Sequence, residues 1–430
     1  MKRSNCPQPA AQLSPWQVAS LARLLGPAGG PLEIQARSWR SRPMARFATD
    51  LIAARARDHA VEEVVQGLDG EVRCLLRDRR GRRQELLLRF ASEVSGLIAK
   101  MSIRPVLAND LTVRAPHPDD IAAMRQLELS APVVRDDGTE LVIDHNGRQF
   151  DHAAVAVDHR YLAAFRGDRM VAVQGVVLAS APIGGVMRRV AFNHYSRTNP
   201  ENRQGGNVLH LILTLYYDIF PVIEQFLSVV DVQNVAGLRL SLGEPWPTRI
   251  RRLFLPVAAL AQRARPPLAN RPFDPRHAAA LLNATHAGMN LWVPRTPEFL
   301  IERRHRAPAV YGPSAWRMTD HAALALWPSG ERRTYRTESG ETVRTLALAL
   351  DYGFNGERGR AELTGLLSQA AKELLGQGIS HIALFVSDDH PPTAWLAELA
   401  EAADSYAVCA PVLESPAPPT GPVYIDHVLF

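Results

Sequence analysis

The chain has 430 residues, a formal net charge of +5 and 46% hydrophobic residues. This length exceeds that of one ordinary domain, so we expect a soluble globular protein with two or three cores. Its three cysteines show neither disulfide-framework nor zinc-site spacing, and no run reaches the roughly 18 apolar residues that a membrane helix needs. We therefore expect a cytoplasmic protein with no metal and no membrane partner.

The N-terminal region, residues 1–108, is basic, with 18 Lys or Arg against 10 Asp or Glu. Apolar spacing over residues 43–67 predicts a helix or helix pair, and residues 71–77 and 84–90 are typical of the two strands of a hairpin. Its tip carries Arg77, Arg79, Arg80, Arg82 and Arg83. No aromatic residues are interleaved, which favours a solvated tip over a nucleic-acid site, and an acidic protein is the alternative partner.

From residue 111 onward the pattern changes to alternating strands and helices. A strand at 111–114 precedes a helix at 118–129, which Pro118 and Asp119 begin in an N-cap arrangement. After a polar segment at 133–157, the predicted elements are a hairpin of residues 161–166 and 170–179, a strand at 187–196, a helix at 207–220 and a strand at 226–232.

A glycine-bearing turn joins the strand at 187–196 to the helix that follows. The turn contains Arg203, Gln204, Gly205, Gly206, Asn207 and Val208. Free backbone N–H groups and the helix dipole at such a turn attract a phosphate, although the same pattern also suits a plain turn. It resembles the acyl-CoA loop of the GNAT family of N-acetyltransferases, in which Arg or Gln is followed by two residues, Gly, one residue, and Gly or Ala. Arg203 and Gly206 match this pattern, and Val208 departs from it.

The order of the neighbouring elements resembles the same family, and it returns in the second half. After an Arg- and Pro-rich linker at 261–272 come a helix at 275–285, strands at 322–327 and 345–350, a helix at 361–375, a strand at 381–386 and a final strand at 421–430. The second glycine-bearing turn, at 352–359, lacks the phosphate-loop pattern. Residues 316–329, this turn and the closing strand resemble the tandem acetyltransferase-like proteins of the plant hookless type.

The resemblance implies an α+β fold with a mixed α/β sheet, built from two tandem GNAT-like acyltransferase domains behind a small basic α+β module. The module spans residues 1–108, the domain with the acyl-CoA loop spans 109–260, and a degenerate domain spans 273–430.

The resemblance also implies where the chemistry lies. The fourth strand splays from the fifth, and here that strand carries Phe192, His194 and Tyr195. Phe192 would pair with the cofactor, and His194, which titrates near neutrality, is the candidate base, although a strand histidine is more often a satisfied polar residue. The family's usual tyrosine after Asn234 is missing, so Ser241, a water molecule or Tyr195 is the candidate acid.

Two polar residues near the following strand each have two interpretations. Asp231 interrupts an apolar strand, either as a buried hydrogen-bonded carboxylate or as a base acting through water. Asn234 matches a cofactor-side asparagine of the family, and alternatively caps the helix after it.

The predicted function is an acyl-CoA-dependent N-acyltransferase. It would use acetyl-CoA or another acyl-CoA as donor and a small-molecule or peptide amine as acceptor, without a metal. Two alternatives stay open: a donor on an acidic carrier protein that meets the basic module, and a catalytically silent regulatory protein. Nucleic acid is not an expected partner.

Overall fold

The computed structural model describes residues 60–66, 71–77, 83–90, 98–106, 110–205, 210–212, 214–215, 219, 222–241, 244–263, 268, 270–410 and 419–426. The described strands form a four-stranded sheet and a 13-stranded sheet. No helix in these segments is both long and apolar enough to cross a membrane.

The four-stranded sheet comes from the basic N-terminal region. Its strands are β1 (Ala60–Gln66), β2 (Glu71–Arg77), β3 (Arg83–Phe90) and β4 (Ile98–Pro105), all antiparallel in chain order. The predicted hairpin is thus β2–β3. The helix predicted over 43–67 is wrong for its last part, because Val61, Val64 and Val65 pair with β2. Helical spacing alone did not separate the two states, and the β-branched residues favour a strand once a partner strand is present.

The first half of the large sheet has the predicted order, except that the segment 133–157, described only as polar, contains two short strands and a helix. Its elements are β5 (Thr112–Arg114), α4 (Ile121–Ser130), β6 (Val133–Val134), β7 (Glu140–Asp144), α5 (Gln149–Val155), β8 (Asp158–Arg166), β9 (Arg169–Ile183), β10 (Val186–Thr198), the 3-10 helix η2 (Pro200–Gly205), β11 (Gln225–Asp231), α7 (Val235–Leu240) and β12 (Glu244–Pro256). The described residues of the helix predicted at 207–220 are helical. Gly167, with φ +57°, turns the β8–β9 hairpin.

The second half repeats this order. Its elements are α8 (Val257–Gln262), α9 (Pro275–His286), α10 (Pro297–Arg306), α11 (Pro308–Tyr311), β13 (Trp316–Met318), β14 (Ala322–Thr337), β15 (Gly340–Phe354), α12 (Gly356–Leu375), β16 (His381–Ser387), the 3-10 helix η5 (Pro391–Leu399) and β17 (Ala402–Ala410). Each half holds one parallel strand pair, β10–β11 in the first and β15–β16 in the second.

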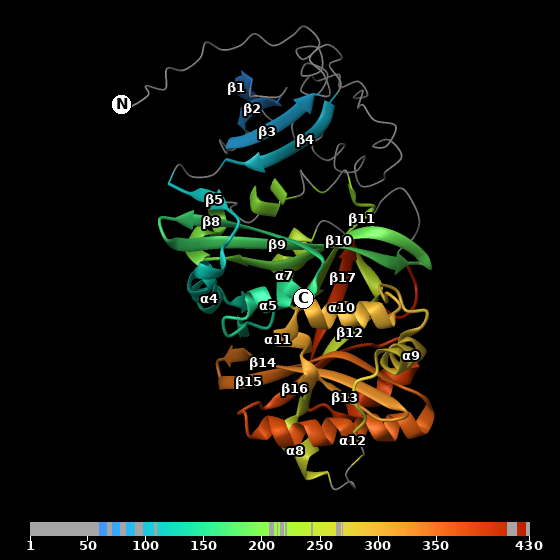
Figure 1. Cartoon of the computed structure of the whole chain (residues 1–430). Helices are drawn as coiled ribbons and strands as arrows, with labels where there is room; N and C mark the ends of the chain where they lie inside the picture. Colours follow the sequence, from blue (N-terminus) through green and yellow to red (C-terminus); the bar gives the residue numbers. More distant parts are fainter. Residues whose placement is uncertain are drawn as a thin grey trace, which may run out of the picture.

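The two halves exchange strands, as the sheet order β10-β11-β17-β12-β16-β15 shows. The last strand of the second half, β17, lies between β11 and β12, and β12 lies between β17 and β16 (Figure 1). In addition, β7 of the first half pairs with β14 of the second. One continuous sheet therefore joins both halves.

Helices cover both faces of this sheet. In the second half α12 and α8 pack on one face through Leu363, Leu366 and Leu367, while α9 to α11 pack on the other (Figure 1). In the first half α4 covers one face through Met124 and Leu127, and the helical segment around Leu211 and Leu215 covers the other. Because the helices cover the faces of the sheet, the strand ends at the junction of the two halves are the remaining place for a site.

The prediction of a final strand at 421–430 is wrong for the residues that the structure describes. Residues 419–426 contain a single bridge, between Val423 and Asn290, and residues 427–430 lie outside the described segments. The last strand of the sheet is β17, which the sequence analysis missed. Its central residues Asp404 to Ala407 mix polar and small side chains, and a strand in that position is defined by its two neighbours in the sheet rather than by its own pattern.

Candidate active site at the strand splay

A cavity opens where β10 and β11 separate. Their parallel pairing runs from Val190 with Gln225 to Asn193 with Ser228. Beyond it lies a cavity of about 200 Å³, lined from the first half by residues 193–197, 229–231 and Arg252, and from the second by Arg333, Phe385 and Tyr406. The cavity is thus built where the two halves meet.

A bulge in β10 shapes one wall of this cavity. The pairing of β10 with β9 is irregular between His194 and Arg197, and Tyr195 has a φ of +55°. A left-handed conformation at a tyrosine costs on the order of 1–3 kcal/mol and persists only where surrounding contacts hold it. Here the hydroxyl of Tyr195 donates a hydrogen bond of 2.5 Å to Oε1 of Glu128.

Glu128, on α4, is the buried hub of the site. It is fully buried, and besides Tyr195 it accepts hydrogen bonds from Nδ1 of His145 at 2.5 Å, from the backbone N–H of His145 at 3.1 Å and from Nε2 of Gln149 at 2.9 Å. Burial favours the neutral carboxyl, but the charge and hydrogen bond of His145 outweigh it and lower the pKa of Glu128. Glu128 is therefore a carboxylate.

The charge of Glu128 raises the pKa of both ring-bearing side chains bonded to it, His145 and Tyr195. Burial alone would lower the pKa of His145, but the charge and hydrogen bond of Glu128 more than offset this and raise it above its ordinary value. Burial and the charge of Glu128 hold the pKa of Tyr195 well above 10, so its hydroxyl stays protonated and donates. Because Nδ1 of His145 is bonded to Glu128, Nε2 is the nitrogen left to exchange a proton with a ligand.

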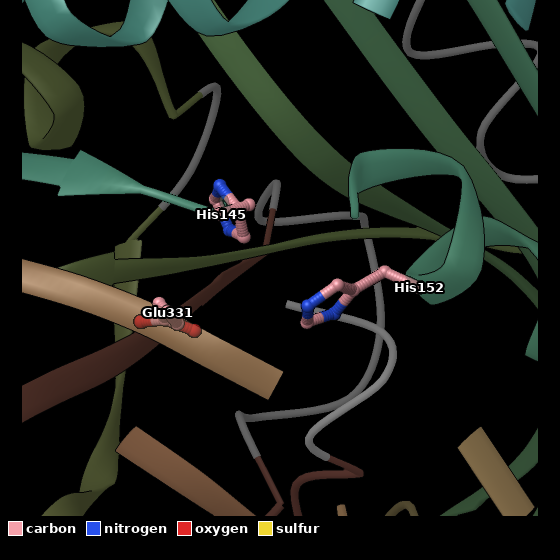
Figure 2. A group of neighbouring side chains, drawn as sticks. All are labelled: His145, His152 and Glu331. Atoms are coloured by element: carbon pink, nitrogen blue, oxygen red, sulfur yellow. The ribbon is translucent and has the colours of Figure 1, made fainter. Parts of the chain in front are cut away.

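Figure 2 shows His145 together with His152 of α5 and Glu331 of β14, three buried side chains from three elements. One potential ligand atom from each lies within 4.8 Å of the others, a spacing that suits a metal ion. However, Glu331 already accepts hydrogen bonds from Nε of Arg333 at 2.8 Å and from Arg252 at 3.2 Å. Two guanidinium groups neutralise this carboxylate and would repel a divalent cation, so we assign Glu331 to the protein's own network of ion pairs.

Further ion pairs lie at the cavity, and some of them join the two halves. Arg135 donates to Asp231 at 2.5 Å and to Asp404 at 2.8 Å, and Arg333 donates to Asp404 at 3.0 Å. Burial raises the pKa of Glu331 to about 7. These charges belong to side chains from four strands or loops that are distant in the sequence, and they fix the halves against each other.

Four of the predicted site residues lie together at the cavity. His194, Tyr195, Asp231 and Asn234 all line it. Nε2 of His194 lies 2.9 Å from the hydroxyl of Tyr161, and Asp231 is bonded to Arg135, which is the hydrogen-bonded alternative named for it. The side chain of Asn234 caps α7 by accepting from the N–H of Gly237 at 2.9 Å, while it also faces the cavity. Their catalytic and cofactor roles stay predictions.

The other predicted cofactor residues are placed differently. Phe192 is buried and lines a second cavity, of about 490 Å³, rather than the one at the splay. Arg203, Gln204 and Gly205 form the end of η2, directly after β10. Gly206, Asn207 and Val208 lie outside the described residues.

The sequence analysis missed Glu128 and His145. One signal for Glu128 was present: it follows Met124 by four positions on α4, which places an acidic residue on the buried face of that helix. His145 carried no such signal, because it follows β7 in a segment that we described only as polar.

Comparisons with known proteins support the fold. No family model matches the sequence, and no curated protein is similar to it in sequence. A Saccharomyces cerevisiae N-myristoyltransferase with bound myristoyl-CoA matches with a TM-score of 0.52 and 9% identity, over 74% of this chain and 85% of that one. A second structure of the yeast enzyme matches with a TM-score of 0.50 and 10% identity, over 71% of this chain and 79% of that one.

A GCN5-related N-acetyltransferase from Sphaerobacter thermophilus matches with 13% identity and a TM-score of 0.43, over 76% of this chain and 100% of that one. The match to the yeast enzyme extends over both halves of the large sheet. The predicted fold class, a mixed α/β sheet of acyltransferase type in two tandem halves, is confirmed. The narrower resemblance to the plant hookless type receives no support from these structures.

Proposed function

We propose that this protein is an acyl-CoA-dependent N-acyltransferase that works at the splay between β10 and β11. The observation that carries the proposal is the cavity between these parallel strands, which both halves line in a fold like that of N-myristoyltransferase. That neighbour holds myristoyl-CoA, and a thioester donor suits a strand splay for a physical reason.

Separated strands leave backbone groups available to a donor. Beyond Asn193 and Ser228 the facing edges of β10 and β11 no longer pair with each other. Backbone N–H groups on such an edge can pair with the amides of pantetheine, and one of them can stabilise the oxygen of the thioester as it gains charge. The glycine-bearing turn that starts with Arg203 follows on the same strand, where it would hold the pyrophosphate.

The chemistry needs a base close to the acceptor amine, and we assign this role to His145. The nitrogen of the acceptor forms a bond to the acyl carbon, and the bond between that carbon and the sulfur of CoA breaks. One of the two protons lost by the ammonium group passes to Nε2 of His145, and the other passes to the leaving sulfur. Glu128 holds the imidazole through Nδ1 and stabilises its charged form.

His194 is a weaker base candidate than His145. Its Nε2 lies 2.9 Å from the hydroxyl of Tyr161, a neutral group, whereas Nδ1 of His145 is bonded to the buried carboxylate of Glu128. Tyr195 serves the same network by orienting Glu128 through its hydroxyl. We therefore place Tyr195 as a positioning residue, although it was a candidate substitute for the family's missing acid.

The test is isothermal titration of the purified protein with acetyl-CoA and with longer acyl-CoAs. Micromolar binding that is lost in Arg203→Glu supports the proposal. The matched control is Arg188→Glu, which reverses the same charge on β10 but lines neither cavity. Absence of binding by every acyl-CoA in the wild type would overturn the proposal and leave a carrier-protein donor or a silent protein.

A further inference from the structure

The cavity at the splay contains one arginine, Arg197, that differs from the two arginines beside it in its bonding partners. Three arginines line this cavity: Arg197, Arg252 and Arg333. Arg252 and Arg333 are both bonded to Glu331, and Arg333 is also bonded to Asp404. Arg197 donates to the carbonyl oxygen of Ser196 at 2.9 Å, and within the described segments no carboxylate lies within ion-pair distance of it.

The guanidinium of Arg197 is directed into the site. It lies 5.7 Å from the centre of the Tyr195 ring. Its positive charge contributes to lowering the pKa of Glu128 and opposes the protonation of His145, so both groups feel it. A half-buried guanidinium has lost part of its hydration, and a bidentate carboxylate is the partner that matches its geometry.

We infer that the ligand of this cavity brings an anionic group, a carboxylate, that pairs with Arg197. The inference rests on the proposed function and narrows its substrate class. The carboxylate can belong to the acceptor, which would then be an amino-acid-like molecule, or to the far end of the acyl group, as in a dicarboxylic acyl-CoA. In both cases it takes no part in the bond changes and serves to orient the reacting partner beside His145.

Two series of ligands distinguish these sources. For the donor, succinyl-CoA is titrated against valeryl-CoA, which has a chain of similar length without the carboxylate. For the acceptor, the twenty amino acids are compared with their amides by the rate of thiol release from acetyl-CoA. We expect the carboxylate-bearing member to be favoured by about tenfold or more in one series.

The variants connect this preference to Arg197. Arg197→Gln should abolish it, Arg197→Lys should keep part of it, and Arg188→Gln, on the same strand, should leave it intact. Acetyl-CoA should bind equally well to the wild type and to Arg197→Gln. Equal affinities and rates for the matched pairs in both series would overturn the inference. It would also be overturned if Arg197→Gln weakened the binding of acetyl-CoA as much as that of the carboxylate-bearing ligands, because Arg197 would then bind CoA itself.

Failure of the proposed function has a different signature. If no acyl-CoA binds to the wild type, amino acids and their amides are titrated alone. A preference for the amino acids that Arg197→Gln removes still supports a carboxylate at Arg197, and the same affinity for both overturns it.

Discussion

The two halves of the sheet differ at the point where their parallel strands stop pairing. In the first half the gap beyond the paired part of β10 and β11 is a cavity. In the second half the pairing of β15 with β16 ends at Leu348 and Ala383, and beyond it the hydroxyl of Tyr352 donates to the carbonyl oxygen of Phe385 at 2.9 Å. A side chain thus bridges the second gap.

Buried charges lie beside this second gap. Fully buried Asp351 accepts from Arg295 at 3.1 Å and from the hydroxyl of Tyr311 at 2.9 Å, while Asp426 accepts from both Arg295 and Arg303. The comparison teaches that the same strand arrangement can leave a cavity or be bridged by a side chain. The side chains at the splay decide which, and the missing phosphate-loop pattern in the second half agrees with closure.

The largest expected effect is on catalysis in the first half. Each half has a histidine 2.5 Å from a glutamate, His145 with Glu128 and His381 with Glu401. His145→Ala should lower kcat/KM for acyl transfer by 100- to 10,000-fold, about 3 to 5 kcal/mol, because a general base is lost. The matched control, His381→Ala, should leave it unchanged, and rates that fall equally in both variants would contradict the assignment.

The next effect is on stability in the second half. Asp351→Ala leaves Arg295 and Arg303 with fewer buried partners, so the free energy of unfolding should fall by about 3–5 kcal/mol in urea denaturation. Glu341→Ala, which removes an exposed partner of Arg336, should cost less than about 1 kcal/mol. Similar costs for the two variants would show that the buried network does not hold the second gap closed.

A smaller effect on stability is expected from removing the hydroxyl of Tyr352 that bridges the second gap. Tyr352→Phe removes one buried hydroxyl and its hydrogen bond to the carbonyl oxygen of Phe385, which should destabilise the protein by about 0.5–1.5 kcal/mol. Chemical denaturation measures this loss, and acyl-CoA binding at the first half should not change. A variant as stable as the wild type would mean that the hydroxyl does not bridge the strands.

The smallest effect is a difference in titration between the two histidines. The pKa of His145 is raised, whereas burial outweighs Glu401 and lowers the pKa of His381. Glu401 has 48% of its side chain exposed and is screened by water, but Glu128 is fully buried. Imidazole NMR should therefore show His145 titrating above pH 6.5 and His381 below it, and the opposite order would refute this explanation.

The raised pKa has consequences for both rate and stability. The protonated His145 stabilises the folded protein fully below the unfolded-state pKa, and this contribution is lost as the pH rises through the folded-state value. A base must be unprotonated, so acyl transfer should increase over the same rise in pH, and kcat/KM measured across this range tests it.

The local sequence pattern was sufficient to predict an element wherever the conformation of that element depends on its own residues. The β8–β9 hairpin followed from Gly167 and Asp168 between alternating apolar residues, and the cap of α7 followed from Asn234. It failed for β1, where Val61 and Val64 suited both helical spacing and a strand, and the choice depended on pairing with β2.

The sequence by itself determined the order of most elements, because periodicity, caps and turns are short-range properties, and its resemblance to the GNAT family predicted the fold class and the position of His194 and Tyr195 at the splay. Only the tertiary structure decided which side chains meet there. Glu128 contacts Tyr195, 67 residues further on, and Glu331 enters from the other half of the sheet. Strand exchange brings β17 beside β11, and no local pattern encodes which distant strand completes a sheet or which charge neutralises another.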